Sequence, residues 1–238
     1  TNAITGVTGA WIDSLPMFII SGQVQKIDLI NKTKTRQIGV QEINIIDLVK
    51  PVTKYAKTIL DPKMIDIHLN ESYEKMIEGK PGPVWLDVPL DIQSKFIDLK
   101  DIKKFKSNKK IKENNINFSL IERSIKNSQR PVLVIGNGLH ISKSETEFRK
   151  LFKILNIPVI SSWNASDILK SSEKLYAGRM GIFGDRTSNF AVENSDLIIA
   201  LGTRLSIPQT SYKTKLFAQK ANKIIVDIDK NELNKKKF

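Results

Sequence analysis

The sequence contains no cysteine and only two histidines, His68 and His140, which lie far apart along the chain. The lack of cysteine excludes disulfides, thiolate metal sites and thiol catalysis, and it is typical of a reducing compartment such as the cytoplasm. No apolar run reaches the roughly 18 residues of a membrane span, so we expect no membrane partner. No Ser/His/Asp set, paired catalytic carboxylate or P-loop stands out either. The chain begins at Thr1 inside a helix-like pattern and ends just after a predicted strand, so we expect a fragment.

Positive charge is in excess, with 38 Lys and Arg against 25 Asp and Glu and a formal net charge of +13. Such an excess raises the hypothesis of a nucleic-acid-binding surface. The excess is mostly lysine spread along the chain, with dense runs only over residues 99–115 and 234–238 and few aromatic residues among them. We therefore favour a solvated surface and a linker, and we expect no nucleic-acid partner.

The first half of the chain alternates helical and strand patterns. Small and apolar residues at helical spacing predict a helix over residues 1–14, in which Gly6 and Gly9 indicate close packing against another backbone or a ligand. Further segments are an amphipathic helix over 41–50, a helix over 64–79 with Met64, Ile67, Tyr73, Met76 and Ile77 near one face, and buried strands over 16–22 and 82–89. Continuous apolar strands between helices predict a parallel sheet covered on both faces.

The lysine-rich segment over residues 100–115 is the predicted linker, and the pattern restarts after it. Helices are predicted over 118–128, 144–156, 186–195 and 214–221, and strands over 131–136, 157–162, 196–202 and 222–229. Four strands separated by helices predict an open doubly wound α/β domain.

The segment "PVLVIGNGLHIS" (131–142) places Gly136 and Gly138 between a strand and a helix. There, a glycine turn and a helix N-terminus can bind a phosphate. The third glycine of a dinucleotide fingerprint is missing, and the next strand ends without an acidic residue. On this segment alone, a plain strand-to-helix corner is the favoured interpretation.

Two later segments also lie where open α/β sheets bind ligands. "GRMGIFG" has glycine at 178, 181 and 184, a spacing that indicates tight turns, close approach to something flat or bulky, or an irregular loop. "VDID" places Asp227 and Asp229 at the carboxyl end of the last strand, where a carboxylate can accept from ribose hydroxyls. Asp229 could equally be the N-cap of a following helix.

Taken in order, the segments resemble the acetolactate-synthase-like group of thiamine-diphosphate-dependent enzymes. The matching pieces are "TNAITGVTGAWIDSLPMFIISGQV", "IGVQEINIIDLVKPVTKYA", "GKPGPVWLDVPLDIQ", "PVLVIGNG", "GRMGIFG", "NFAVENSDLIIALGTRL" and "IIVDIDKNEL". The resemblance implies two open parallel-sheet α/β domains. Residues 1–99 would be part of the pyrimidine-binding domain with the thiamine-diphosphate-binding fold, 100–115 the linker, and 116–238 a Rossmann-like central domain, which holds FAD in several members.

The resemblance also implies roles for particular residues. Asn2, Gln23 and Gln41 match the thiamine diphosphate pocket, in which Gln41 would face the reactive ring. The segments that line FAD match Lys80, Gly136, Gly138, Gly181, Gly184, Arg204, Asp227 and Asp229, with Lys80 standing where flavin-binding members usually have arginine. The activating glutamate would lie before Thr1 and the Gly-Asp-Gly metal and diphosphate motif after Phe238. We therefore expect no catalytic residue and no metal ligand in this chain, which alone would be inactive.

The function implied is that of a decarboxylase and carboligase for a 2-oxo acid such as pyruvate, with thiamine diphosphate, Mg²⁺ and, in some members, FAD. The implied assembly is a homodimer or homotetramer. Three departures, "RLSIPQ" for "RFDDR", Leu90 for lysine and Val40 for phenylalanine, favour another acceptor such as an oxo-sugar. The alternative is a non-catalytic nucleotide-binding α/β module.

Overall fold

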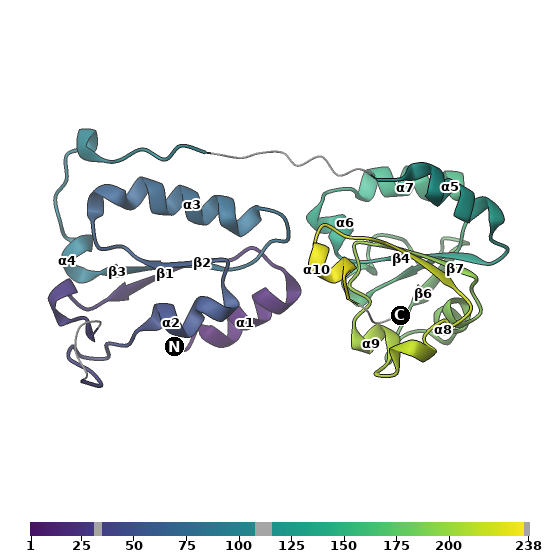
Figure 1. Ribbon diagram of the computed structural model, residues 1–238, viewed down its shortest axis with the longest axis horizontal. Helices are drawn as coiled ribbons and strands as arrows, with labels where there is room; N and C mark the ends of the chain where they lie inside the picture. The colour runs from purple at the N-terminus through teal and green to yellow at the C-terminus, as the bar shows by residue number, and fades with distance from the viewer. Residues whose placement is uncertain (31–34, 108–115, 236–238) are drawn as a thin grey trace. The chain divides into compact units, whose positions relative to one another are not determined.

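The computed structural model describes residues 1–30, 35–107 and 116–235. The chain divides into two compact units, Thr1–Lys112 and Glu113–Phe238, and each is described by itself (Figure 1). The predicted linker over residues 100–115 lies partly outside the described residues, so it stays a prediction. None of the described helices has the length and apolar character that a membrane span requires.

The N-terminal unit contains a parallel three-stranded sheet in the order β1-β3-β2. The strands are β1 (Phe18–Gln23), β2 (Tyr55–Thr58) and β3 (Val84–Pro89). In Figure 1, α3 (Ile65–Ile77) covers one face, and α1 (Ile4–Asp13) and α2 (Ile45–Val49) cover the other. A short helix, α4 (Leu90–Gln93), follows the central strand. The prediction of a parallel sheet covered on both faces is confirmed.

Burial on both faces explains why the central strand is apolar without alternation. Successive side chains of β3 enter opposite cores, since side chains alternate along a strand. Trp85 packs with Val7 and Val49 on the α1 and α2 side. Leu86 packs with Ile59 on the other side. The strand ends at the carboxyl edge of the sheet, where the loop after β1 also begins.

Two predictions for this unit need correction. The sequence did not predict β2, because an edge strand with the polar residues Lys57 and Thr58 lacks a continuous apolar run. The predicted face of the helix over 64–79 is also rotated, since Tyr73 is 54% exposed whereas Ser72 is fully buried. The face of the helix that carries His68, Glu71 and Ser72 lies toward the sheet, where the Tyr55 hydroxyl on β2 forms hydrogen bonds with His68 and Glu71.

The C-terminal unit contains a parallel five-stranded sheet in the order β6-β5-β4-β7-β8. The strands are β4 (Pro131–Ile135), β5 (Val159–Ser161), β6 (Tyr176–Arg179), β7 (Leu197–Leu201) and β8 (Asn222–Val226). The first strand lies in the middle, and the order reverses between β4 and β7. In open α/β sheets, ligands bind at such a reversal, beyond the carboxyl ends of the strands.

Helices cover both faces of this sheet, as Figure 1 shows. They are α5 (Phe118–Asn127), α6 (Gly138–Ile141), α7 (Glu145–Leu155), α8 (Arg186–Glu193), α9 (Ile207–Thr210) and α10 (Lys230–Leu233). Phe148 and Phe152 of α7 fill the core on one face. Val192 of α8 and Phe217 fill the core on the other. The doubly wound α/β fold predicted from the sequence is therefore confirmed.

Two predictions for the second unit are wrong in detail. A fifth strand, β6, is present and was not predicted, because its four residues include Gly178 and Arg179. The helix predicted over 214–221 is only a single 3₁₀ turn, Thr214–Leu216. Its continuation is interrupted at Ala218, which is fully buried and has a left-handed φ of 41°.

Candidate functional site

The carboxyl edge of the N-terminal sheet brings together two of the three predicted pocket residues. Gln23 is the last residue of β1, and its Nε2 donates to the carbonyl of Ile43 at 3.0 Å. Ile43 lies two residues beyond Gln41, so Gln23 is tied to the loop that carries Gln41. Asn2 precedes α1, is exposed, and forms no side-chain hydrogen bond with the rest of the described chain.

The carboxamide of Gln23 is almost fully used within the chain. Besides Ile43, Nε2 donates to Oδ2 of Asp87 at 3.1 Å, and Oε1 accepts from the amide of Val24 at 3.0 Å. Both donor hydrogens are therefore occupied, since an amide group carries two. Gln23 could contact a ligand only through a remaining lone pair of Oε1. Its main role within the chain is to connect the end of β1 to Asp87 on β3 and to Ile43 in the loop that carries Gln41.

Asp87, on the central strand, is a buried carboxylate without a cationic partner among the described residues. The residue is 2% exposed, and its Oδ1 accepts from Oγ of Ser21 at 2.5 Å. Ser21 in turn accepts from Nε1 of Trp85 at 2.7 Å. Burial raises the pKa of Asp87, and the hydrogen bonds from Ser21 and Gln23 oppose that rise. Sequence reasoning missed Asp87, because one aspartate within an apolar strand has no motif around it.

Gln41 occupies a strained backbone position at the tip of a turn. The amide of Glu42 donates to the carbonyl of Gly39 at 3.2 Å, which closes a turn with Val40 and Gln41 at its centre. Gln41 has a φ of 59°, in the left-handed region where a turn of this kind usually has glycine. A side chain there costs about 1 kcal/mol. The side chain is exposed, so burial does not compensate for that cost, and strain of this kind is common at functional sites.

The turn is fixed on both sides by its neighbours. A Cβ on Gly39 would lie 2.8 Å from Cγ1 of Val24, so glycine lets the turn approach the end of β1 closely. Glu42 is 5% exposed, and its Oε1 accepts from the amide of Ile30 at 3.2 Å. Its Oε2 has no hydrogen-bond partner among the described residues. No sequence signal identifies Glu42 as buried, because glutamate is usually exposed.

Gly6 and Gly9 lie on the exposed side of α1. Apart from the backbone of α1 itself, a Cβ at either position would have no atom of the described chain within 4 Å. The described chain therefore places no other backbone against these glycines, and close packing against a ligand stays a prediction.

In the second unit, the "GNG" segment forms a clasp between β4 and β7. The amide of Gly136 donates to the carbonyl of Leu201 and the amide of Gly138 to that of Gly202, both at 3.0 Å. A Cβ on Gly136 would lie 2.3 Å from the Gly202 oxygen, and one on Gly138 would lie 2.6 Å from the Gly202 Cα. The contact with Gly202 accounts for both glycines. Their amides are used within the chain.

The "GRMGIFG" loop also closes on itself and on the segment after β7. Gly178 and Gly181 have φ values of 96° and 109°. A Cβ on Gly181 would lie 2.3 Å from the carbonyl oxygen of Pro208, and one on Gly184 would lie 2.4 Å from that of Arg179. Asn189 fixes the loop, accepting from the amide of Gly181 at 2.9 Å and donating to its carbonyl at 3.1 Å.

An aromatic pair at this edge was missed by sequence reasoning. The rings of Trp163 and Phe183 lie 5.6 Å apart between centroids, at an angle of 44°. Phe183 is 77% exposed and Ile182 beside it is 63% exposed. An aromatic residue directly after a predicted strand, as Trp163 is after the strand predicted over 157–162, is the signal that could have identified the pair.

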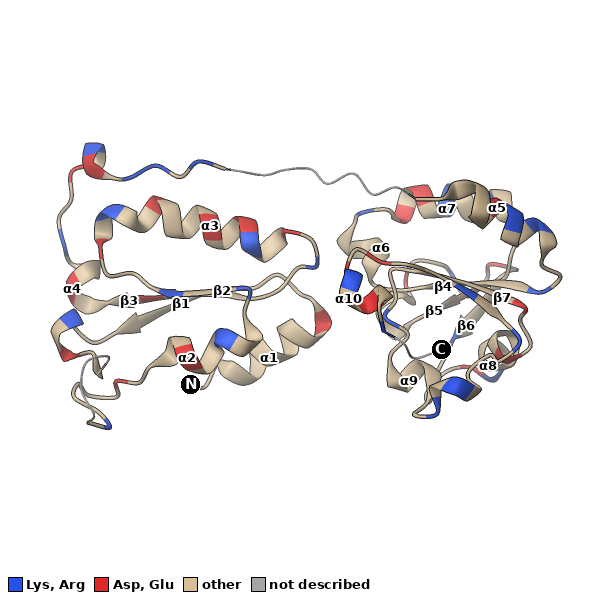
Figure 2. Ribbon diagram, viewed as in Figure 1, with Lys and Arg blue, Asp and Glu red and all other residues tan. Residues whose placement is uncertain are grey.

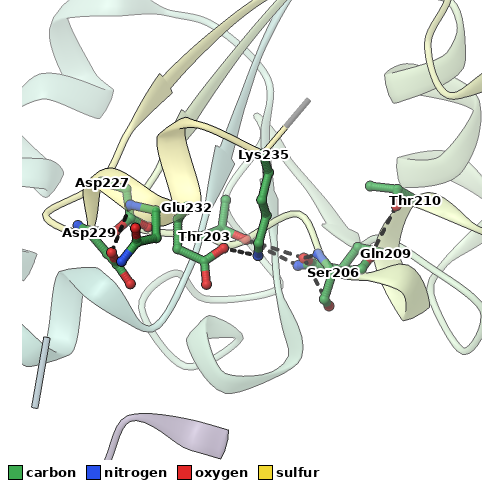
Figure 3. Close-up of polar contacts among 9 residues, drawn as sticks. Thr203, Ser206, Gln209, Thr210, Asp227, Asp229, Glu232 and Lys235 are labelled. Carbon is green, nitrogen blue, oxygen red and sulfur yellow. Dashed lines mark hydrogen bonds and ion pairs between the residues drawn. The ribbon is translucent and has the colours of Figure 1, made fainter. Parts of the chain in front are cut away.

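The segment after β7 places one cation on the surface among buried neighbours. Arg204 is exposed between the buried Thr203 and Leu205, and forms no ion pair or hydrogen bond with the rest of the described chain. Gln209 Oε1 accepts from the amide of Ser206 at 2.9 Å, which with the Ser206 hydroxyl caps α9 (Figure 3). The sequence "RLSIPQ" thus folds as a capped helical turn.

Asp227 and Asp229 lie between β8 and α10, as Figure 3 shows. Asp227 Oδ1 accepts from the amide of Asp229, and Asp229 Oδ1 accepts from the amide of Asn231, both at 2.9 Å. Asp229 is therefore an N-cap, the alternative that the sequence left open. Glu232 and Lys235 form an ion pair beyond it.

Lys80 and His140 are two further polar residues near the predicted sites. Lys80 belongs to the first unit, where its carbonyl accepts from Nζ of Lys54 at 2.8 Å. His140, just after the clasp, lies between Glu145 and Asp167, at 2.8 Å from Nδ1 to Oε1 and 2.9 Å from Nε2 to Oδ1. Burial disfavours the charged imidazole, but both carboxylates favour it more strongly, so the pKa of His140 is raised.

Charges of both signs occur together on the helices of the described residues, including α3, α5 and α10 (Figure 2). Among the residues the structure describes, no group of three or more His, Asp or Glu side chains could hold a metal ion.

Comparison with known proteins links both units to one family. The family model described as "Thiamine pyrophosphate enzyme, central domain" matches residues 120–238. The acetolactate synthase large subunit of Cyanidium caldarium is 30% identical over 245 residues, which cover 100% of this chain and 41% of that protein. A probable acetolactate synthase large subunit of Methanocaldococcus jannaschii is 31% identical over 246 residues, covering 99% and 40%. The chloroplastic acetolactate synthase 2 of Nicotiana tabacum is 31% identical, covering 100% and 35%. The chain thus spans about two fifths of the length of these relatives.

Proposed function

The chain belongs to the thiamine pyrophosphate enzyme family, and on this premise we propose that it is part of a thiamine-diphosphate-dependent 2-oxo-acid decarboxylase and carboligase of the acetolactate-synthase type. The observation that carries the proposal is similarity to acetolactate synthase large subunits along the whole chain, through both units in the same order. A nucleotide-binding module without catalysis is not favoured, because that similarity includes the N-terminal unit.

The strained turn supports the assignment of the cofactor pocket to the N-terminal unit. Thiamine diphosphate, when bound with Mg²⁺, supplies a carbanion for decarboxylation of a 2-oxo acid and transfer of the remaining carbon unit. Gln41 fits this site, since its exposed carboxamide can both donate and accept a hydrogen bond. Gln23 holds the turn, and Asn2 would contribute from the start of α1. The sequence contains no Gly-Asp-Gly motif, so residues 1–238 by themselves would not catalyse the reaction.

The alternative of an acceptor other than a second pyruvate, such as an oxo-sugar, is not favoured, because the relatives matched along the whole chain are acetolactate synthases. Val40, beside Gln41, is 88% exposed and Leu90 is 54% exposed, at positions where the family resemblance implies phenylalanine and lysine. The segment from Arg204 to Gln209 forms a capped turn with one exposed cation, in place of the charged "RFDDR" sequence. These differences are the reason to test an oxo-sugar beside pyruvate as the acceptor.

Activity of the complete gene product that includes this chain tests the proposal. With thiamine diphosphate and Mg²⁺, it should consume pyruvate and release carbon dioxide, and removal of Mg²⁺ by a chelator should abolish both. Gln41→Ala should lower the rate at least about tenfold, the equivalent of one hydrogen bond to a reacting group. Gln25→Ala, at an exposed position in the same loop, should leave it unchanged. No consumption of pyruvate or of other 2-oxo acids by the cofactor-loaded protein would contradict the proposal.

FAD in the second unit is a separate part of the proposal. Trp163 and Phe183 present two exposed aromatic rings at an angle of 44°, Arg204 an exposed cation and Asp227 a carboxylate, and groups of these kinds can contact a flavin nucleotide. The amides of Gly136 and Gly138 do not fit a phosphate site, because both donate within the chain. Gly136, Gly138, Gly181 and Gly184 would not bind FAD directly. They would only allow the loops of the site to pack closely against other backbone. The role of FAD would be structural, without hydride transfer.

Two residues of the proposed flavin set fit it less well. Asp229 caps α10 in the described structure, and Lys80 keeps a positive charge but lacks the planar fork of arginine. The visible absorption spectrum of the purified complete protein tests the flavin directly. Flavin bands that survive gel filtration would support it, and a colourless protein that takes up no added FAD would refute it.

The remaining parts of the proposal concern the assembled protein. A homodimer or homotetramer is predicted from the family resemblance, with Mg²⁺ bound alongside thiamine diphosphate and the protein in the cytoplasm. Light scattering after gel filtration measures the assembly state, and a monomer at micromolar concentration would contradict it.

A further inference from the structure

We infer that Asp87 and Gln23 form a positioning relay that fixes the turn carrying Gln41 at the carboxyl edge of the N-terminal sheet. The inference deepens the proposed function and rests on it, since it assigns Gln41 to the cofactor pocket. Neither residue needs to touch a ligand for the relay to work. Asp87 would act through Gln23, and Gln23 through the carbonyl of Ile43.

Asp87 is held rigidly by the core of the N-terminal unit. Asp87 lies on β3, the strand with neighbours on both sides, and its residue is 2% exposed. Its Oδ1 is fixed by Ser21 at 2.5 Å, and Ser21 is fixed by Trp85 at 2.7 Å. The indole can only donate, so Ser21 accepts from Trp85 and directs its own hydroxyl hydrogen to Oδ1 of Asp87. The position of Oδ2 is therefore set by the core of the unit.

Gln23 connects Asp87 to the loop that carries Gln41. Oδ2 of Asp87 accepts one Nε2 hydrogen of Gln23 at 3.1 Å, and the other hydrogen goes to the carbonyl of Ile43 at 3.0 Å. Oε1 of Gln23 accepts from Val24, so a flip of the amide would put donors against donors at Val24 and acceptors against acceptors at the other two contacts. One orientation alone satisfies all three contacts.

The strained backbone at Gln41 needs support from contacts outside its own side chain. Gln41 has a left-handed φ of 59° and an exposed side chain, so nothing in its own packing stabilises the strained form. A strained residue persists only when its surroundings determine its conformation. The turn is held at Gly39 by close contact with Val24 and beyond Gln41 by the bond from Gln23 to Ile43. Loss of the second contact should let the turn relax.

Hydrogen exchange in the cofactor-free complete gene product measures the relay without any activity. The reporters are the amides of Glu42 and Ile45, which donate to Gly39 at 3.2 Å and to Ile43 at 2.8 Å. Asp87→Asn should accelerate their exchange about tenfold, because a neutral amide oxygen accepts a weaker hydrogen bond than a carboxylate does, and because the new amide nitrogen would face either Nε2 of Gln23 or the Ser21 hydroxyl that now donates to Asp87. Amides in α3 should exchange as in the parent protein.

Two further variants make the test specific. Gln23→Met removes the three hydrogen bonds with little change in length, lies at a partly exposed position, and should accelerate the same two amides even where Asp87→Asn does not fold. The matched control is Asp91→Asn, at a partly exposed carboxylate whose Oδ1 accepts from the amide of Lys26 at 2.9 Å and which retains an acceptor oxygen. It should change neither amide. Unchanged exchange at Glu42 and Ile45 in a folded Gln23→Met protein would overturn the inference.

Steady-state kinetics separate this inference from the proposed function. If the relay positions Gln41, both relay variants should lower kcat about tenfold or more, with a smaller change in KM for the 2-oxo acid. Faster exchange in a protein whose parent shows no carboligation would support the relay and refute the function. Normal exchange and normal kcat in an active protein would refute the relay and leave the function standing.

Discussion

The two units use their loops at the carboxyl ends of strands in opposite ways. In the second unit, the glycine loops close on the chain itself, with the amides of Gly136 and Gly138 bonded to the segment after β7. In the first unit, the turn at Gln41 is strained and its side chain is exposed. A glycine-rich motif can thus be explained by packing alone, whereas strain without compensating burial indicates a residue kept for another purpose.

The largest effect should come from breaking the clasp in the second unit. Gly136→Ala places a methyl group 2.3 Å from the Gly202 oxygen, which lies in another strand's loop and cannot move away cheaply. We expect the free energy of unfolding to fall by about 3 kcal/mol. Denaturant titration measures it. A loss below about 1 kcal/mol would show that the two loops separate easily and that the clasp is not structural.

The matched substitution in the first unit should have the opposite sign. Gly9→Ala in α1 adds a methyl group with no described atom within 4 Å, in a helix where glycine is unfavourable. The free energy of unfolding should rise by about 1 kcal/mol. The same titration applies. A loss of stability, or dissociation of an oligomer, would show that this side of α1 is packed against another chain.

The smallest effect should come from His140, and it should depend on pH. Its pKa is raised in the folded state, so its contribution is fully present below the unfolded pKa of about 6.5 and is lost as pH rises through the folded value. His140→Gln should therefore lower the free energy of unfolding by a few tenths of a kcal/mol at about pH 5.5 and by less at about pH 8.5. Equal losses at both pH values would mean that the two carboxylates do not stabilise the charged imidazole.

Much of the fold can be predicted from apolar runs in the sequence and from the residues that end them. The runs at β3, β4 and β7 predict buried parallel strands, and Gly79 ends α3 with a φ of 59° as a residue after a helix C-terminus should. The edge strands β2 and β6 escape prediction, because polar and glycine residues at an edge carry no continuous apolar signal. The segment over 214–221 has a helical pattern, but tertiary packing places Ala218 in a left-handed conformation.

The candidate site is predictable only in part. Gln23 and Gln41 can be identified by the resemblance to a family. The different roles of the two glutamines cannot be identified in this way. Which of two glutamines is exposed, and which has both amide hydrogens bonded within the chain, depends on contacts between segments distant in sequence. Asp87, 64 residues beyond Gln23, is the clearest example. Short-range patterns also do not distinguish glycines that face a ligand from those that face another loop, as the contacts at Gly202 show.

The most direct test of the account is Gln41→Gly in the complete gene product, with stability and carboligation measured on the same preparation. Glycine relieves the left-handed strain, so the free energy of unfolding should rise by about 1 kcal/mol, while the carboxamide is lost and the rate should fall at least about tenfold. Stability and activity should therefore change in opposite directions in this variant. A variant that is no more stable than the parent, or that keeps full activity, would contradict the claim that the strained turn is maintained for catalysis.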